Sequence, residues 1–336
     1  MKKFIFLVLL FSLFAFLGIS QNTTKATKQT QGTQTITKKI HIPPQVESVI
    51  NPIFLSKKGN NLYSFKEIKT FFFPSADGKS FLIYLFNAQI PEYKRTINIP
   101  QYPKGKDGKP DKTKKPTLVQ KEVKVPFHFY IKLKNQATGE VVEYNSPMPE
   151  GVVNFYSFTM PLAPGKFSGV IAISPLDFAT DKIATHYFET TVPDFAAESK
   201  KLTYTEPMFI KSLHPYNSQQ LVFTVMKNTF LMGRALVDAI LTNTFSKTDV
   251  PRLVMYLLGT KKDSKTGKPL VEMDFKIKNH RGKDVAKYKP IKLQRNIIVQ
   301  PLSFKSLKSG NYSIVLKVKD LIGKKKTEIK IPFTLK

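Results

Sequence analysis

The chain has no cysteine and no tryptophan among its 336 residues. Without cysteine, disulfides, thiolate metal sites and cysteine nucleophiles are all excluded, so we expect stability to come from large, well-packed domains. Tryptophan is the flat aromatic side chain that carbohydrate-binding platforms use most. Its absence indicates that the 27 phenylalanines and 13 tyrosines mainly fill hydrophobic cores.

Acidic residues and arginines are also scarce. The chain has 24 aspartates and glutamates against 53 lysines and arginines, which gives a net charge of +29, and five of the basic residues are arginine. Specific recognition of phosphates and base edges favours the planar fork of arginine. We therefore expect no nucleic-acid partner, and we interpret the charge as a looser attraction to a protein or an anionic envelope polymer.

The longest apolar run, Phe4–Leu17, has 14 residues, whereas a membrane-spanning helix needs about 20. Two lysines precede this run and the small-residue segment Gly18-Ile19-Ser20 follows it, which is typical of a cleavable secretory signal peptide over residues 1–20. Residues 21–41 consist mainly of threonine, glutamine and lysine and are expected to form a flexible tether. The mature chain would then be exported to a periplasmic, cell-surface or extracellular location, with no transmembrane segment.

The second half of the chain repeats the first. Residues 129–144 (FYIKLKNQATGEVVEY) align with residues 273–288 (MDFKIKNHRGKDVAKY). A shorter motif recurs at nearly the same offset: Leu162, Gly165 and Phe167 correspond to Leu307, Gly310 and Tyr312. The period is too long for a solenoid unit and indicates duplication of a whole domain. We expect one domain at 42–197 and another at 198–336.

Alternation typical of antiparallel strands runs through both halves. The set Tyr312, Ile314, Leu316 and Val318 occupies every second position, which places it on one face of a strand. Similar runs are bounded by glycine, proline, asparagine and aspartate throughout the chain. In Phe230–Phe245 the apolar residues could also stripe a helix, but Gly233 and the surrounding pattern favour a strand.

The motif Leu307-x-x-Gly310-x-Tyr312 resembles the corner that precedes strand F in immunoglobulin-like and fibronectin-III-like sandwiches. In that corner a tyrosine hydroxyl bonds to the backbone upstream, and the glycine fits a position with positive φ. The first copy has Phe167 where the second has Tyr312. We therefore predict an all-β fold with two tandem immunoglobulin-like antiparallel β-sandwich domains related by internal duplication.

Three features of the second half match a module of bacterial secreted proteins. These features are Phe245-Ser-x-x-Asp249, the loop Asp263–Pro269, and the corner at Tyr312 with Asp320 and Gly323 after it. Over Thr244–Lys336 the chain is thus similar to the sandwich part of proteins named for a GWxTD motif, although that motif itself is absent. The resemblance implies a β-sandwich attached to envelope or surface proteins, and it brings no activity.

The sequence has no recognisable catalytic motif. It lacks a G-x-S-x-G elbow, a P-loop, an H-E-x-x-H pair and an acidic calcium loop. The five histidines have no second ligand at metal-binding spacing: they are His41, His128, His186, His214 and His280. We predict a protein that is not an enzyme, with no catalytic residues, no cofactor and no metal. A hydrolase with a site assembled from distant residues is the alternative.

Two lysine-rich loops contain the candidate binding residues. Each precedes the same predicted strand of its copy, so we expect both loops at the same corner of their domains. They would attract anionic polymers or lipid headgroups, or else form ordinary solvated surface. The lysines are Lys104, Lys106, Lys109, Lys112, Lys114 and Lys115 in the first loop, and Lys261, Lys262, Lys265 and Lys268 in the second.

These observations together predict an exported, non-enzymatic binding or scaffolding protein of the bacterial cell envelope. One alternative is a periplasmic chaperone of surface subunits, since such chaperones have two immunoglobulin-like domains and lend an edge strand to a client. A second alternative is an adhesin that binds anionic polymers or carbohydrate. The oligomeric state and the identity of the partner stay open.

Overall fold

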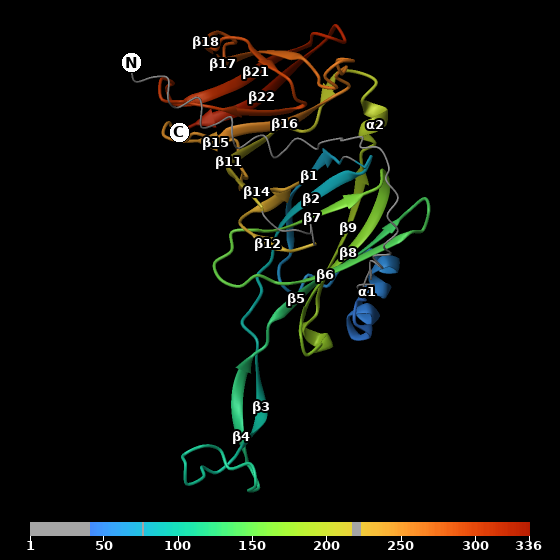
Figure 1. The fold of residues 1–336 in the computed structure, drawn as a ribbon, viewed down its shortest axis with the longest axis vertical. Coiled ribbons are helices and arrows are strands. Elements are labelled where there is room, and N and C mark those ends of the chain that lie inside the picture. Colours follow the sequence, from blue (N-terminus) through green and yellow to red (C-terminus); the bar gives the residue numbers. More distant parts are fainter. Residues whose placement is uncertain (1–40, 76, 217–222) are drawn as a thin grey trace.

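The computed structural model describes residues 41–75, 77–216 and 223–336 (Figure 1). The signal peptide expected at 1–20 and nearly all of the tether expected at 21–41 lie outside the described residues. Within them the chain is mainly β and forms several sheets, almost all antiparallel. No helix of the described ranges is long and apolar enough to cross a membrane.

Two four-stranded sheets pack face to face to form the first sandwich. Their strand orders are β1-β2-β7-β12 and β6-β5-β8-β9. Aromatic rings fill the space between them, and Tyr84, Phe86, Phe129 and Phe158 are almost wholly buried there. The strands are β1 (Lys66–Pro74), β2 (Ser80–Asn87), β5 (Phe127–Asn135), β6 (Val141–Pro147), β7 (Tyr156–Leu162), β8 (Gly165–Pro175), β9 (Ala184–Val192) and β12 (Met226–Lys227).

Two six-stranded sheets form the second sandwich, which lies above the first in Figure 1. Its core includes Met255, Phe275, Phe304 and Leu316, all at most 1% exposed. One sheet contains β10 (Thr203–Tyr204), β11 (Met208–Pro215), β13 (Phe230–Met232), β14 (Ala235–Ile240), β16 (Arg252–Leu258) and β20 (Ile297–Pro301). The other contains β15 (Thr244–Phe245), β17 (Val271–Asn279), β18 (Asp284–Lys287), β19 (Ile291–Leu293), β21 (Gly310–Asp320) and β22 (Lys325–Leu335). A short helix, α2 (Phe195–Glu198), connects the two sandwiches, and a 3-10 turn, η2 (Thr180–Lys182), precedes β9.

The two sandwiches share their strand order. The sheet β6-β5-β8-β9 matches β18-β17-β21-β22, and β1-β2-β7 matches β11-β16-β20. The register also agrees, since Phe129 pairs with Ile173, and Met273, 144 residues after Phe129, pairs with Val318, 145 residues after Ile173. The repeated sequence segments therefore occupy equivalent strands.

A helix that the sequence analysis missed covers the outer face of the first sandwich. α1 (Pro44–Ser56) packs on β8 and β9 (Figure 1). Val46 and Ile50, one turn apart, are wholly buried against Tyr130 and Val170 of the sheet. The expectation that alternating strands run through both halves was wrong for this segment. The helix signal is a proline in the first turn followed by apolar residues at positions i and i+4. Here this signal outweighs the surrounding β pattern.

A third apolar cluster joins the two sandwiches. Phe73 of β1 and Ile83 of β2 face out of the first sandwich and pack with Ile210, Val237 and Val254 of the second. All five are at most 2% exposed. The Phe71–Phe73 run, expected to fill domain cores, thus places two of its rings in the cluster between the sandwiches.

The chain returns to the first sandwich after the boundary expected at 197/198. β12 extends the sheet edge at β7, with Met226 opposite Ser157, and the Ser157 hydroxyl donates to the Thr229 carbonyl at 2.6 Å. Phe223 and Val225 lie in the first core. If the chain is divided at 197/198, residues that belong to the core of the first sandwich therefore fall within the segment 198–336.

The ambiguous stretch after residue 230 is a β-hairpin. β13 and β14 pair with Met232 opposite Ala235, so Gly233 and Arg234 form a two-residue turn. Gly233 has a φ of +61°, which suits the first central position of a type II′ turn. The strand prediction is confirmed, and the competing helix is wrong.

Candidate functional site: a basic hairpin arm

The six lysines of the first loop lie at the tip of a long hairpin. β3 (Lys94–Gln101) and β4 (Thr117–Lys124) pair with each other and with no other described strand. Figure 1 shows this hairpin, here called the arm (residues 94–124), projecting from the body of the first sandwich. The arm is inserted between β2 and β5, where the second sandwich has a simple loop between β16 and β17.

The arm is strongly basic. It contains ten basic and three acidic residues, for a net charge of +7. All six tip lysines are exposed. Lys114 makes an ion pair with Asp111, with Nζ 3.7 Å from Oδ2, and the other five have no ion-pair partner among the described residues. Hydrogen bonds from the hydroxyl and the backbone N–H of Thr113 lower the pKa of Asp111, which therefore stays ionised and orders the turn.

Polar contacts fix the root of the arm from both strands. The Tyr93 hydroxyl donates to Oδ2 of Asp177 at 3.2 Å, and Nη1 of Arg95 lies 3.7 Å from the same oxygen. On the other strand, Nζ of Lys124 donates to Oε2 of Glu150 at 2.9 Å. The Asp177 side chain is 12% exposed, so this contact is better shielded from solvent than an ordinary surface ion pair.

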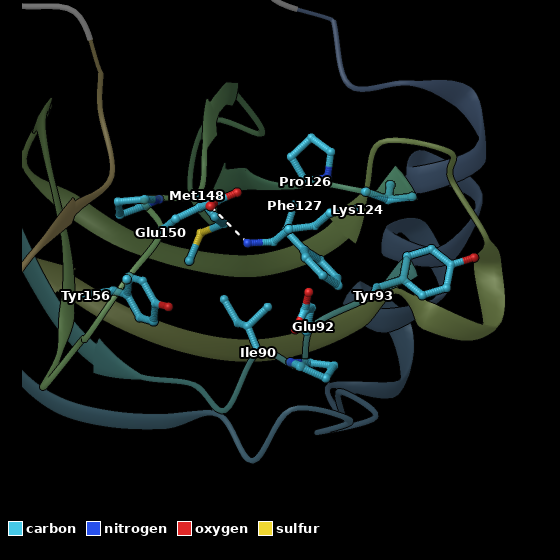
Figure 2. A pocket seen from close by; sticks show the side chains of 13 residues that line it. Ile90, Glu92, Tyr93, Lys124, Pro126, Phe127, Met148, Glu150 and Tyr156 are labelled. Carbon is cyan, nitrogen blue, oxygen red and sulfur yellow. Dashed lines mark hydrogen bonds and ion pairs between the residues drawn. The ribbon is translucent and has the colours of Figure 1, made fainter. Parts of the chain in front are cut away.

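Two hollows adjoin the root. One of about 200 Å³ lies beside the Lys124–Glu150 pair, with Ile90, Met148 and Phe127 around it (Figure 2). The other, of about 430 Å³, is lined by Tyr63, Tyr93 and Phe127 among others. Burial raises the pKa of Tyr63 to about 12, so its hydroxyl stays protonated and donates to the Lys182 carbonyl. Both hollows combine apolar and aromatic side chains with charged ones, since Glu92 borders each of them.

The second lysine-rich loop lies at the opposite end of the molecule. Its four lysines are exposed, and Asp263 accepts the backbone N–H groups of Thr266 at 2.8 Å and Lys265 at 3.0 Å, which lower its pKa. The two loops occupy equivalent connections of the two sandwiches. In space, however, β3 and β4 carry the first loop away from the body of the first sandwich, so it does not lie at the corner equivalent to that of the second loop (Figure 1).

The corner residues support the fold. The Tyr312 hydroxyl donates to the Lys308 carbonyl at 2.7 Å, and its ring stacks on Phe333 with centroids 5.5 Å apart. The two glycines of the repeated motif both have φ near +145°, with values of +142° for Gly165 and +148° for Gly310. Leu162, Phe167 and Leu307 are buried.

A serine, a histidine and an aspartate that the sequence analysis did not connect meet on β11 and β14. Oγ of Ser212 lies 2.8 Å from Nε2 of His214 and donates to Asp238, whose Oδ2 is 3.5 Å from the same Nε2. In a catalytic triad the carboxylate holds the other ring nitrogen. The arrangement therefore lacks the relay of a hydrolase. Strand register brings Ser212 opposite Asp238 across a bulge, which no local motif reveals.

Metal ligands do not gather in the described ranges, where no group of three or more histidines, aspartates or glutamates could hold an ion.

Comparisons with known proteins assign the chain to no family. No family model matches the chain, and no curated protein matches it. A solved structure described as "Crystal structure of tetra-tandem repeat in extending region of large adhesion protein" is similar, with a TM-score of 0.20 and 8% identity over 77% of this chain. The chain spans 56% of the length of that structure. A TM-score of this size supports no conclusion about function.

Proposed function

We propose that the chain is an exported, non-enzymatic binding or scaffolding protein of a bacterial cell envelope, and that the arm contacts its anionic partner. The observation that carries the proposal is the arm, a basic segment held outside every buried cluster of the described residues. Ordering a segment that fills no core costs conformational entropy. Such a segment is best explained by contacts that it makes outside the molecule.

The proposal includes two copies of one immunoglobulin-like module. Shared strand order, shared register and a glycine with positive φ before each corner support the duplication. The copies differ chiefly by two insertions. The segment with β12, β13 and β14 joins the sandwiches to each other, whereas the arm of the first copy extends into solvent. The arm is therefore the insertion available to a partner.

The composition of the arm indicates the class of partner. Its tip presents lysines as separate point charges, and arginine is restricted to Arg95 at the root. Lysine ammonium groups are strongly hydrated and lack the bidentate geometry of arginine. The expected attraction is consequently loose and sensitive to salt, as suits an anionic polymer or an acidic protein surface more than a single phosphate group.

Binding of the mature chain, residues 21–336, to heparin as a polyanion probe tests the proposal. We expect binding at low salt that weakens steeply toward physiological salt, because exposed charges are screened over about 8–10 Å. Changing the six tip lysines to glutamine should lower the affinity more than about tenfold, since each lysine near an anionic surface contributes about 1 kcal/mol.

The matched control changes the four lysines of the second loop, 261–268, to glutamine. This variant should lose less affinity than the arm variant, and both should melt at the parental temperature because these side chains fill no core. An arm variant that binds heparin as well as the parent would remove the arm from the proposed function.

A further inference from the structure

The arm has two chemically different faces. Side chains that pair across β3 and β4 lie on the same face of the ribbon. The register places Arg95 opposite Val123, Ile97 opposite Lys121, and Ile99 opposite Val119. One face, here called the apolar face, thus carries four β-branched residues and two basic ones: Arg95, Ile97, Ile99, Val119, Lys121 and Val123.

The opposite face of the arm is polar from its root to its middle and ends at Leu118, which pairs with Pro100 and is 65% exposed. Thr96 lies opposite Glu122 and Asn98 lies opposite Gln120. Alternation of this kind is typical of a strand pair with one face in water and the other against a partner surface. The arm therefore has the alternation of a sheet whose apolar face packs against a second sheet.

The apolar face lies outside every buried cluster of the described residues. Ile97, Ile99 and Val123 are half-buried and Val119 is 42% exposed, and none of the four belongs to a buried cluster. A two-stranded ribbon alone is marginally stable in water. Covering this face would stabilise the ribbon by burying aliphatic surface.

Three kinds of occupant can be compared on charge and position. A bilayer approached by the tip would meet lysine, aspartate and glycine, since residues 103–116 contain no aliphatic side chain larger than proline. A second copy of the chain brings another +29 toward the +7 of the arm, and such charges repel each other. An acidic polypeptide complements both the charge of the arm and its aliphatic stripe.

We propose that the apolar face of the arm is the docking surface for an extended acidic segment of a partner protein, in which acidic and apolar residues alternate. The apolar side chains of the segment pack between Ile97, Ile99 and Val119, and its carboxylates lie near Arg95, Lys121 and the tip lysines. This inference rests on the proposed function and names the partner class of the same arm.

Two synthetic peptides of equal length and charge test the inference, one of alternating Glu-Val and one of alternating Glu-Ser. In fluorescence anisotropy with the mature chain, we expect the Glu-Val peptide to bind about tenfold more tightly, because valine side chains are buried in one complex and absent from the other. Replacing the tip lysines with glutamine should weaken both peptides by a similar factor.

The decisive variant combines Ile97→Thr, Ile99→Thr and Val119→Thr, which keeps the β-branched shape but makes the face polar. It should bind the two peptides equally. The control variant, Asn98→Ser with Gln120→Ser on the polar face, should keep the parental preference. If the melting temperature of the triple variant falls below that of the parent, the single substitution Val119→Thr gives the same comparison.

Equal binding of both peptides by the parent, or a preference that survives the threonine substitutions, overturns the inference. Heparin binding that persists in that case leaves the proposed function standing and removes only the acidic polypeptide. A threonine variant that loses binding to anionic phosphatidylglycerol vesicles, with no peptide preference in the parent, assigns the face to a membrane instead.

Discussion

Ile210→Ala tests whether the two sandwiches behave as one cooperative unit. Ile210 is wholly buried in the cluster that joins them. Removing its outer carbons loses apolar burial and leaves a cavity, which costs about 2–5 kcal/mol for a buried isoleucine. We expect a loss of about 3 kcal/mol, and at about 2 °C per kcal/mol for a chain of this size the melting temperature should fall by about 6 °C.

Differential scanning calorimetry of the mature chain separates the interface from the individual cores. The parent should unfold in one transition because the joining cluster and β12 couple the sandwiches. Ile131→Ala provides a matched control, since Ile131 is equally buried but lies in the first core. The control should lower the transition without dividing it, whereas Ile210→Ala should divide or broaden it. Two separate transitions in the parent would refute the coupling.

Two further predictions concern single polar contacts. Tyr312→Phe removes the hydrogen bond to Lys308 but keeps the ring, and should reduce the free energy of unfolding by about 1 kcal/mol; coincident denaturant melts of variant and parent would contradict this. The Lys132 ammonium donates to Glu47 at 2.6 Å and lowers the pKa of this carboxyl group. The ionised Glu47 therefore stabilises the docked helix α1 at pH values above its ordinary pKa. This stabilisation is lost as the pH falls through the lowered pKa. In the Glu47→Gln variant, the hydrogen-exchange protection of the α1 amides should therefore depend less on pH below about pH 4.3 than in the parent. The same pH dependence in variant and parent would show that the pair does not hold the helix.

Regular alternation allowed the strands to be predicted, but it could not give the way they assemble. β5, β8, β17 and β21 follow the period of two closely, and their sequence copies occupy equivalent positions. α1 was missed because its helical period is brief and lies beside strong β segments. The returning strand β12 has two residues, too few for any pattern, and its place against β7 depends on tertiary packing.

The basic loops were visible in the sequence, whereas the arm was not. Residues 104–115 stand out by composition, but a lysine-rich loop has the same composition whether it lies on the body or at the tip of a ribbon. The signal for the arm was the pair of flanking alternating segments, 94–101 and 117–124, whose two faces are distinguishable only once their register is known. The contact of Ser212 with Asp238 was hidden for the same reason.

The return of the chain to the first sandwich also sets an order in time. During synthesis, Val225 follows the last residue of β9, Val192, by 33 positions, which corresponds to about 2–7 s at 5–20 residues per second. Until Phe223 and Val225 emerge, the first sandwich has an unfilled core and an open edge at β7. The N-terminal half therefore lacks part of its native core until residues 223–225 have been made, and it can close fully before the rest of the second half is complete.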